Sequence, residues 1–254
     1  MLLAIDVRNA FAEIGVLRGE ELVWTDQLSV DMKRTESEYA ILLASLLRLR
    51  HVENDAIDGA IIASVVPPLT ARIERAAKRV TGITPLVVGP GVKNGLVIRI
   101  DDPKTLGADL VADSVGALAR YGAPAIIIDF GTATTLAYLN GRGEYRGGAI
   151  CPGLMLAYDA LFQGTSMLTR ISFDHPGRVV GTSTVECMKS GAIYGTASMI
   201  DGMIDRFLLE QKDNPVLVAT GAHAEEVLPH MAHQVHYDPE LMIYGLAAIY
   251  KKNR

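Results

Sequence analysis

Two short segments each place an aspartate between an apolar, strand-like run and a turn, a combination suited to phosphate chemistry. The clearer one reads Asp129-Phe130-Gly131-Thr132-Ala133-Thr134-Thr135. Its glycine permits a tight turn, its amide and hydroxyl groups are donors for phosphate oxygens, and its carboxylate could hold a cation that neutralises them. Phosphoryl transfer depends mainly on such positioning and electrostatics. The alternative interpretation is an ordinary β-turn with a capping aspartate.

The matching segment near the start of the chain, Asp6-Val7-Arg8-Asn9-Ala10, lacks two of these features. Arg8 stands where a glycine is expected, and Ala10 stands where a hydroxyl is expected. A positive φ would be unfavourable for arginine, and alanine has no side-chain donor. As an alternative, Arg8 could bind a phosphate bidentately, but its side chain would have to reach back over its own turn. We therefore expect a damaged first turn.

A third candidate is Gly107-Ala108-Asp109, at the start of a helix predicted from about residue 106 to residue 121. The helix dipole favours an ionised carboxylate at this place, and Asp109 could act as a general base toward a substrate hydroxyl. The alternative is a helix N-cap, which the spacing alone favours.

The elements that must position these residues form two similar halves, each with three consecutive strands followed by helices and a parallel strand. The first half has predicted strands at residues 2–7, 12–17, 21–28, 57–66 and 85–88, with helices that start at the Thr35–Glu38 capping box and after Pro67. The second has strands at 125–132, 134–140, 145–150 and 216–220, and helices from 154, at 184–211 and at 241–251. We expect an α/β fold of two lobes, residues 1–118 and 119–254, facing a central cleft where small ligands bind.

Composition narrows the class of protein. With 254 residues, of which 49% are apolar, the chain can bury sizeable cores, which excludes disordered and fibrous classes. The net charge of −5 offers no basic surface for nucleic acid or an anionic membrane. The two cysteines form no CxxC pair, and no apolar run has the length of a signal-peptide core or a membrane span. We expect a cytoplasmic protein without nucleic-acid or membrane partners.

Six blocks in the same order resemble the type III pantothenate kinases of the actin-like ATPase superfamily, and the similarity covers essentially the whole chain. The blocks are Ser64–Thr70, Gly89–Lys93, Gly107–Asp109, Asp129–Thr135, Gly147–Gly153 and Gly181–Thr184. This resemblance implies two RNase H-like lobes and ATP-dependent phosphorylation of pantothenate to 4'-phosphopantothenate, the first step toward coenzyme A. It also implies a dimer whose pantothenate pocket lies near the subunit interface.

The resemblance assigns roles to matching residues. Asp109 is implied as the catalytic base, and Asp129 as the ligand of a monovalent cation, K⁺ or NH₄⁺. Gly107 and Thr184 are implied on the substrate side, together with Asp109. The side of the site that holds ATP and its Mg²⁺ is implied for Asp6, Asn9, Thr132, Gly148, Pro152 and Gly153.

The chain departs from the family pattern in the same expected cleft. Beyond the first turn, the departures are Val97 for an asparagine, Ile100 for a tyrosine, Leu110 for an arginine and Ala137 for an aspartate. A lost arginine contact to an anion is worth about 2 kcal/mol. Three losses of about 1.4 kcal/mol each would lower the rate roughly a thousandfold.

Three hypotheses follow from these departures. The first is a subunit of a hetero-oligomer that a typical paralogue completes. The second is a homomeric kinase, most simply a homodimer, with altered efficiency or specificity. The third is a ligand-sensing or regulatory protein that keeps the fold without turnover.

Overall fold

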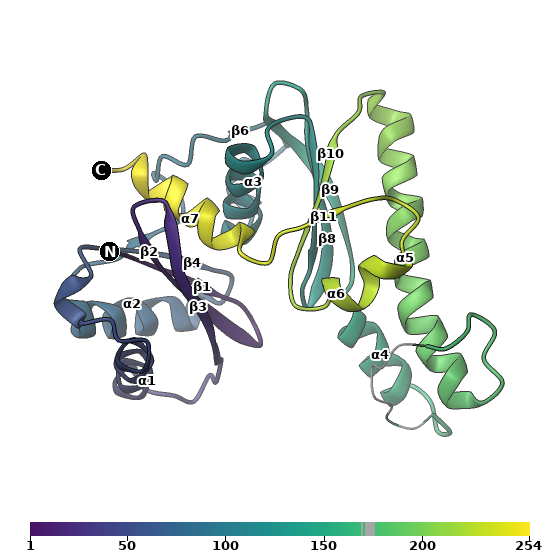
Figure 1. Ribbon diagram of the computed structural model, residues 1–254, viewed down its shortest axis with the longest axis horizontal. Coiled ribbons are helices and arrows are strands. Elements are labelled where there is room, and N and C mark those ends of the chain that lie inside the picture. Colours follow the sequence, from purple (N-terminus) through teal and green to yellow (C-terminus); the bar gives the residue numbers. More distant parts are fainter. Residues whose placement is uncertain (169, 171–175) are drawn as a thin grey trace. The chain divides into compact units, whose positions relative to one another are not determined.

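The computed structural model describes residues 1–168, 170 and 176–254, which form two compact units (Figure 1). The first unit contains Met1–Arg120 and Glu240–Arg254, and the second contains Tyr121–Pro239. The last segment differs from the expected division, which assigned residues 240–254 to the C-terminal lobe. The second unit is thus inserted between two parts of the first.

The first unit is built on a sheet with the strand order β3-β2-β1-β4-β5. Strands β1 (Leu2–Val7), β2 (Phe11–Arg18) and β3 (Glu21–Ser29) form an antiparallel meander. Strand β4 (Gly59–Ser64) runs parallel to β1, and β5 (Leu86–Val87) runs parallel to β4. All six residues of β1 are buried, as expected for a strand in the middle of a sheet.

Helices cover both faces of this sheet (Figure 1). Helices α1 (Glu36–Leu49) and α2 (Pro67–Thr81) share a core with Leu3, Ile5 and Val7 of β1. The predicted capping box of α1 is present, and α2 starts at the expected proline. Helices α3 (Ala108–Arg120) and α7 (Leu241–Lys251) lie on the other face.

The contact between α3 and α7 explains why the last segment joins the first unit. A methyl group on Gly245 of α7 would lie 1.9 Å from the carbonyl oxygen of Ala112, and one on Gly116 of α3 would lie 2.4 Å from that of Leu241. The two helices therefore approach each other through glycines. Helix α7 also packs on β1 and β4, and its buried residues include Leu246 and Ile249.

Five strands of the second unit repeat the strand pattern of the first, in the order β11-β10-β7-β8-β9. Strands β7 (Ala125–Phe130), β8 (Ala133–Leu139) and β9 (Glu144–Pro152) form the meander. Strand β10 (Val216–Thr220) runs parallel to β7, and β11 (His236–Tyr237) runs parallel to β10. In this repeat β1 corresponds to β7, and β4 corresponds to β10.

The helices of the second unit are α4 (Leu154–Gln163), the long α5 (Thr184–Gln211) and the short α6 (Ala224–Val227). Ile193, Ala197 and Ile200 of α5 share a core with Ile126 and Ile128 of β7. The strand β6 (Val97–Ile98) and three 3₁₀ turns, Asn54–Ala56, Pro103–Thr105 and Leu228–His230, complete the described elements. Within the described residues, no helix combines the length and the apolar character needed to cross a membrane.

Candidate functional site

Asp6 is the penultimate residue of β1 and is completely buried. Its neighbours across the sheet are Glu13 of β2 and Ala63 of β4. Side chains alternate along a strand, and Leu3, Ile5 and Val7 face the core that contains α1 and α2. The carboxylate of Asp6 therefore points to the opposite face, where α3 lies.

The guanidinium group of Arg8 contacts two carboxylates, one next to its own turn and one on α3. Its Nε donates to Oδ2 of Asp6 at 2.5 Å, and its Nη2 lies 3.9 Å from Oδ2 of Asp113 on α3. The reach back over the turn that we expected to be unfavourable is therefore present, although toward a carboxylate. The backbone of Arg8 does not have a positive φ. The prediction of backbone strain at this position is therefore wrong. Asn9 and Ala10 are exposed.

Asp109 lies in the first turn of α3 but is not its cap. The helix begins at Ala108, and the carbonyl oxygen of Gly107 accepts the first helical hydrogen bond, from Val111 N at 3.1 Å. Oδ1 of Asp109 accepts from the amide of Leu110 at 2.8 Å. A methyl group on Gly107 would come within 2.3 Å of Oδ1 of Asp109, so glycine leaves room for this carboxylate. The N-cap interpretation of Asp109 is therefore wrong.

Asp113 is a candidate site residue that sequence reasoning missed. It is 1% exposed in the middle of an apolar stretch of α3, and it follows Asp109 by four residues. Residues four apart share one face of a helix, so both carboxylates lie on the same side of α3. A charged residue within an apolar helical run, in step with a candidate base, is the signal that would have identified it.

Asp129 holds the place in the second unit that Asp6 holds in the first. It is the penultimate residue of β7, is 5% exposed, and lies between Thr135 of β8 and Thr220 of β10. Gly221, with φ of 95°, closes against it, because a methyl group there would lie 2.5 Å from Oδ1 of Asp129. Thr132 is exposed in the turn after β7.

The oxygen atoms around Asp129 fit a hard cation. Thr135 lies directly opposite Asp129, and its hydroxyl oxygen is buried with no hydrogen-bond partner among the described residues. No group of three His, Cys, Asp or Glu side chains suited to a metal ion occurs in the part of the chain that the structure describes. A carboxylate beside a hydroxyl oxygen suits a hard, oxygen-preferring ion rather than a transition metal.

Two glycines hold the backbone close around the second turn. The amide of Gly153 donates to the carbonyl of Thr132 at 3.1 Å, and a methyl group on Gly153 would lie 2.3 Å from the carbonyl oxygens of Gly131 and Thr132. On β9, a methyl group on Gly148 would lie 2.0 Å from the carbonyl oxygen of Leu136. Side chains at these two positions would displace the turn and the strand beside it.

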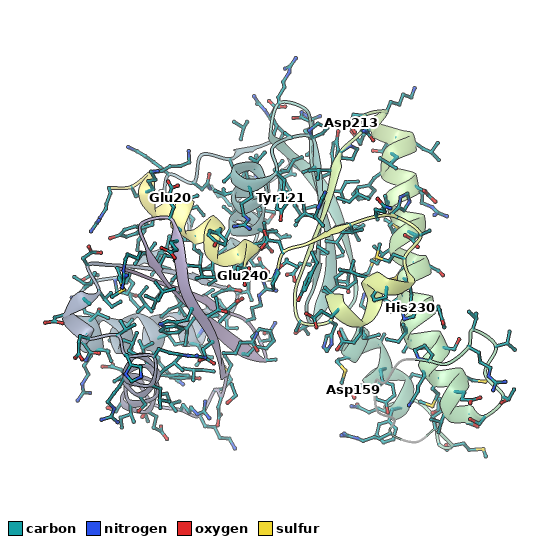
Figure 2. The ribbon with its side chains drawn as sticks, viewed as in Figure 1. Glu20, Tyr121, Asp159, Asp213, His230 and Glu240 are labelled. Carbon is teal, nitrogen blue, oxygen red and sulfur yellow. The ribbon has the colours of Figure 1, made fainter. Side chains whose placement is uncertain are left out.

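Pro152 and Thr184, which were predicted on different sides of the site, line one cavity. It has a volume of about 410 Å³ and lies between α4, marked by Asp159 in Figure 2, and α5. Its other lining residues are mostly apolar and include Tyr158, Met188 and Met199.

The start of α5, beside Thr184, is fixed by two side chains. Ser183 Oγ accepts from the amide of Glu186 at 3.3 Å, and the Glu186 carboxylate accepts from the amide of Thr182 at 2.8 Å and from its hydroxyl at 2.9 Å. These hydrogen bonds, the backbone one first, lower the pKa of Glu186. This reciprocal capping defines the position at which Thr184 enters the helix.

The departures from the family pattern have different surroundings. Val97 is 49% exposed in β6, and Leu110 lies in the first turn of α3. Ala137 is buried in β8 between Ile127 and Gly148, so its methyl group belongs to the sheet interior.

The sequence and the fold of the chain are similar to those of known proteins. Residues 2–206 match the family model described as type III pantothenate kinase. Proteins named type III pantothenate kinase from Pelobacter propionicus and Geobacter sulfurreducens are 41% and 42% identical over 254 residues, covering all of both chains in each case. Among solved structures, a ROK hexokinase from Thermus thermophilus has a TM-score of 0.54 at 13% identity and covers 99% of this chain and 98% of that one. Component A of (R)-2-hydroxyglutaryl-CoA dehydratase from Acidaminococcus fermentans has a TM-score of 0.58 at 14% identity, with the same coverage. These structures share the actin-like ATPase fold with the chain.

Proposed function

Because the chain belongs to the type III pantothenate kinase family, we propose that it takes part in the ATP-dependent phosphorylation of pantothenate to 4'-phosphopantothenate in coenzyme A synthesis. The observation that carries the proposal is the repeated aspartate at a strand end. Asp6 and Asp129 stand at the same point of the two meanders. Asp109, near the start of α3, adds a group for proton transfer. A cytoplasmic location, expected from the sequence, suits this reaction.

In the proposed reaction, the carboxylate of Asp109 accepts the proton of the pantothenate hydroxyl. The hydroxyl oxygen forms a bond to the γ-phosphorus of ATP while the bond to the ADP oxygen breaks. Gly107 has no side chain and so leaves room for the carboxylate of Asp109. Thr184 contributes to substrate binding. Mg²⁺ that accompanies ATP supplies neutralising charge on the phosphates.

The nucleotide side of the site is proposed at the two turns. Asp6 and Asn9 contribute from the first, and Thr132, Gly148, Pro152 and Gly153 contribute from the second. Asp129, with the hydroxyl of Thr135 opposite, is proposed to hold K⁺ or NH₄⁺. Gly148 and Gly153 let the neighbouring backbone pack closely against the second turn. The amides of that turn are proposed to bind phosphate oxygens.

We further propose that the active form is an oligomer in which a typical paralogue completes the site. Helices α4 and α5 present exposed apolar side chains, Met155, Leu156, Leu161 and Val185, next to the 410 Å³ cavity that contains Thr184. Such a concentration of exposed apolar groups suits a subunit interface. The altered first turn, with Arg8 bound to Asp6, favours a partner that supplies an unaltered turn.

Mixing experiments test this proposal. The chain alone, with ATP, Mg²⁺, K⁺ and pantothenate, is expected to give little 4'-phosphopantothenate. A type III pantothenate kinase paralogue whose own catalytic base has been replaced is then added. This mixture is expected to form 4'-phosphopantothenate. The same mixture with Asp109→Asn in this chain should stay inactive. Full activity of the chain alone would instead establish the homomeric kinase, and an inactive mixture would contradict the heteromeric assembly.

A ligand-sensing role is the second candidate. The Arg8–Asp6 contact favours it, because a first turn filled by the arginine side chain can bind a ligand without catalysing phosphoryl transfer. Isothermal calorimetry with ATP and with pantothenate distinguishes the two. Binding without product in every mixture supports sensing, whereas no binding of either compound excludes it.

A further inference from the structure

Three charged side chains meet in the interior of the first unit. The side chains of Asp6, Arg8 and Asp113 are 0%, 13% and 2% exposed. Arg8 binds Asp6 through Nε at 2.5 Å and approaches Asp113 through Nη2 at 3.9 Å. Buried charges cost several kcal/mol each unless opposite charges compensate them. The guanidinium therefore neutralises carboxylates that come from two different elements, β1 and α3.

The internal repeat of the protein provides a comparison for this arrangement. Two residues after the strand-end aspartate, the second unit has Gly131, whereas the first unit has Arg8. Opposite Asp129 lies the buried hydroxyl oxygen of Thr135, and this pair is the proposed site of a cation from solution. At Asp6 the carboxylate is instead paired with the guanidinium of Arg8, a cation that is covalently part of the chain.

We propose that Arg8 is a built-in cation that occupies the ion-binding position of Asp6, so that the first turn neutralises Asp6 and Asp113 without a divalent metal ion. A divalent ion could reach these carboxylates only by displacing a guanidinium held between them. The nucleotide then meets, at the first turn, a fixed organic cation that Asp6 positions, and Mg²⁺ arrives bound to phosphate alone. Removing the arginine should uncover a two-carboxylate site for a hard cation.

The inference deepens the proposed function but does not need turnover for its test. Mn²⁺, which can be followed by electron paramagnetic resonance, is titrated into the full chain without nucleotide or pantothenate. The wild-type protein and Asp6→Asn should show the same weak binding, because Asp6 holds no metal in either. Arg8→Gly should gain one Mn²⁺ site at least tenfold tighter, and Arg8→Gly with Asp6→Asn should lose it.

Two results would overturn the inference. One is a Mn²⁺ site in the wild-type protein that Asp6→Asn removes, since Asp6 would then bind metal beside Arg8. The other is a folded Arg8→Gly variant, by circular dichroism, without a gained site. If Arg8→Gly does not fold, Arg8→Gln, which keeps most of the side-chain volume, replaces it with the same two outcomes. Failure of pantothenate phosphorylation would leave these metal titrations unchanged, so the two proposals fail separately.

Discussion

Tyr138 is a buried phenol of β8 whose hydroxyl donates to the carboxylate of Asp213, just after the end of α5 (Figure 2). Tyr138→Phe removes this charge-assisted hydrogen bond and should lower the free energy of unfolding by about 1.5–3 kcal/mol. Urea denaturation at pH 7.5 measures the loss. An unchanged midpoint would show that the contact contributes nothing.

The same tyrosine predicts a pH dependence. Burial, and next the hydrogen bond to Asp213, raise the pKa of Tyr138 above the ordinary value of 10.0. A pKa raised in the folded state stabilises the protein below the unfolded-state pKa of about 10, and this contribution is lost as the pH rises further. The stability difference between wild type and Tyr138→Phe should therefore shrink between pH 9 and pH 11. A constant difference in thermal melts over this range would contradict the assignment.

Asp109→Asn tests the proposed base at the scale of one atom. Removing a general base typically lowers the rate by about 10²–10⁴-fold. We expect kcat in the active assembly to fall by this amount while the KM for ATP changes little. The control is Asp101→Asn, because Asp101 is exposed outside the described helices and should keep full activity. A fall below tenfold for Asp109→Asn would reject it as the base.

At the residue scale, the sequence predicts the strand-end aspartates well but not their charged partners. Asp6 and Asp129 follow local apolar runs, so a local pattern finds them. Arg8 and Asp113 are separated by more than a hundred residues in the chain, and no local pattern records that they meet. The error about Arg8 came from treating a turn without its long-range neighbours.

At the scale of elements, the close approach of α3 and α7 is the most sensitive contact. Gly245→Ala would place a methyl group 1.9 Å from a backbone oxygen of α3, so the helices must separate. We expect a loss of about 1–3 kcal/mol of stability, as for other overpacked positions. The matched control is Gly191→Ala in α5, where a methyl group meets open space and alanine favours the helix by about 0.5–1 kcal/mol. Equal melting temperatures of the two variants would refute the packing argument.

Elements with a clear sequence pattern were predictable, and two of the short strands were not. The predicted bounds of β1, α5, β10 and α7 agree with the structure, because each has a continuous apolar or periodic pattern between turn residues. Strands β6 and β11 span two residues each, too few for any period to be read. The sheet on which α7 packs could not be predicted, because the apolar pattern of a helix does not indicate which sheet it covers.

At the scale of the whole molecule, the proposed assembly predicts a change in mass. Leu156 of α4 is 49% exposed within the apolar surface beside the cavity. Leu156→Glu would bury a charge at the proposed interface and, in the mixture with the paralogue, should shift the protein from dimer to monomer at about 10 μM, since an unpaired interface charge costs several kcal/mol. Light scattering coupled to gel filtration measures the mass. Leu209→Glu, at a residue of α5 that is 76% exposed and outside the cavity lining, should stay dimeric. A wild-type protein that stays monomeric in the mixture with the paralogue would remove this interface from consideration.

The organisation into two units could be predicted from the sequence, because the same order of predicted strands and helices occurs twice along the chain. The repeated sheet orders, β3-β2-β1-β4-β5 and β11-β10-β7-β8-β9, agree with that reading. Only the path of the chain after Pro239 differs, because the helix that follows it returns to the first unit.

That return has a consequence for how the protein forms on the ribosome. The residues of α7 are synthesised after the whole of the second unit, and until they emerge the faces of β1, β4 and α3 that they cover stay bare. At a translation rate of about 5–20 residues per second, the nascent first unit waits on the order of ten seconds for its missing helix. The inserted unit is therefore the first that can finish folding, and the part of the chain made earliest matures last. During that interval the bare apolar faces are a natural substrate for a chaperone.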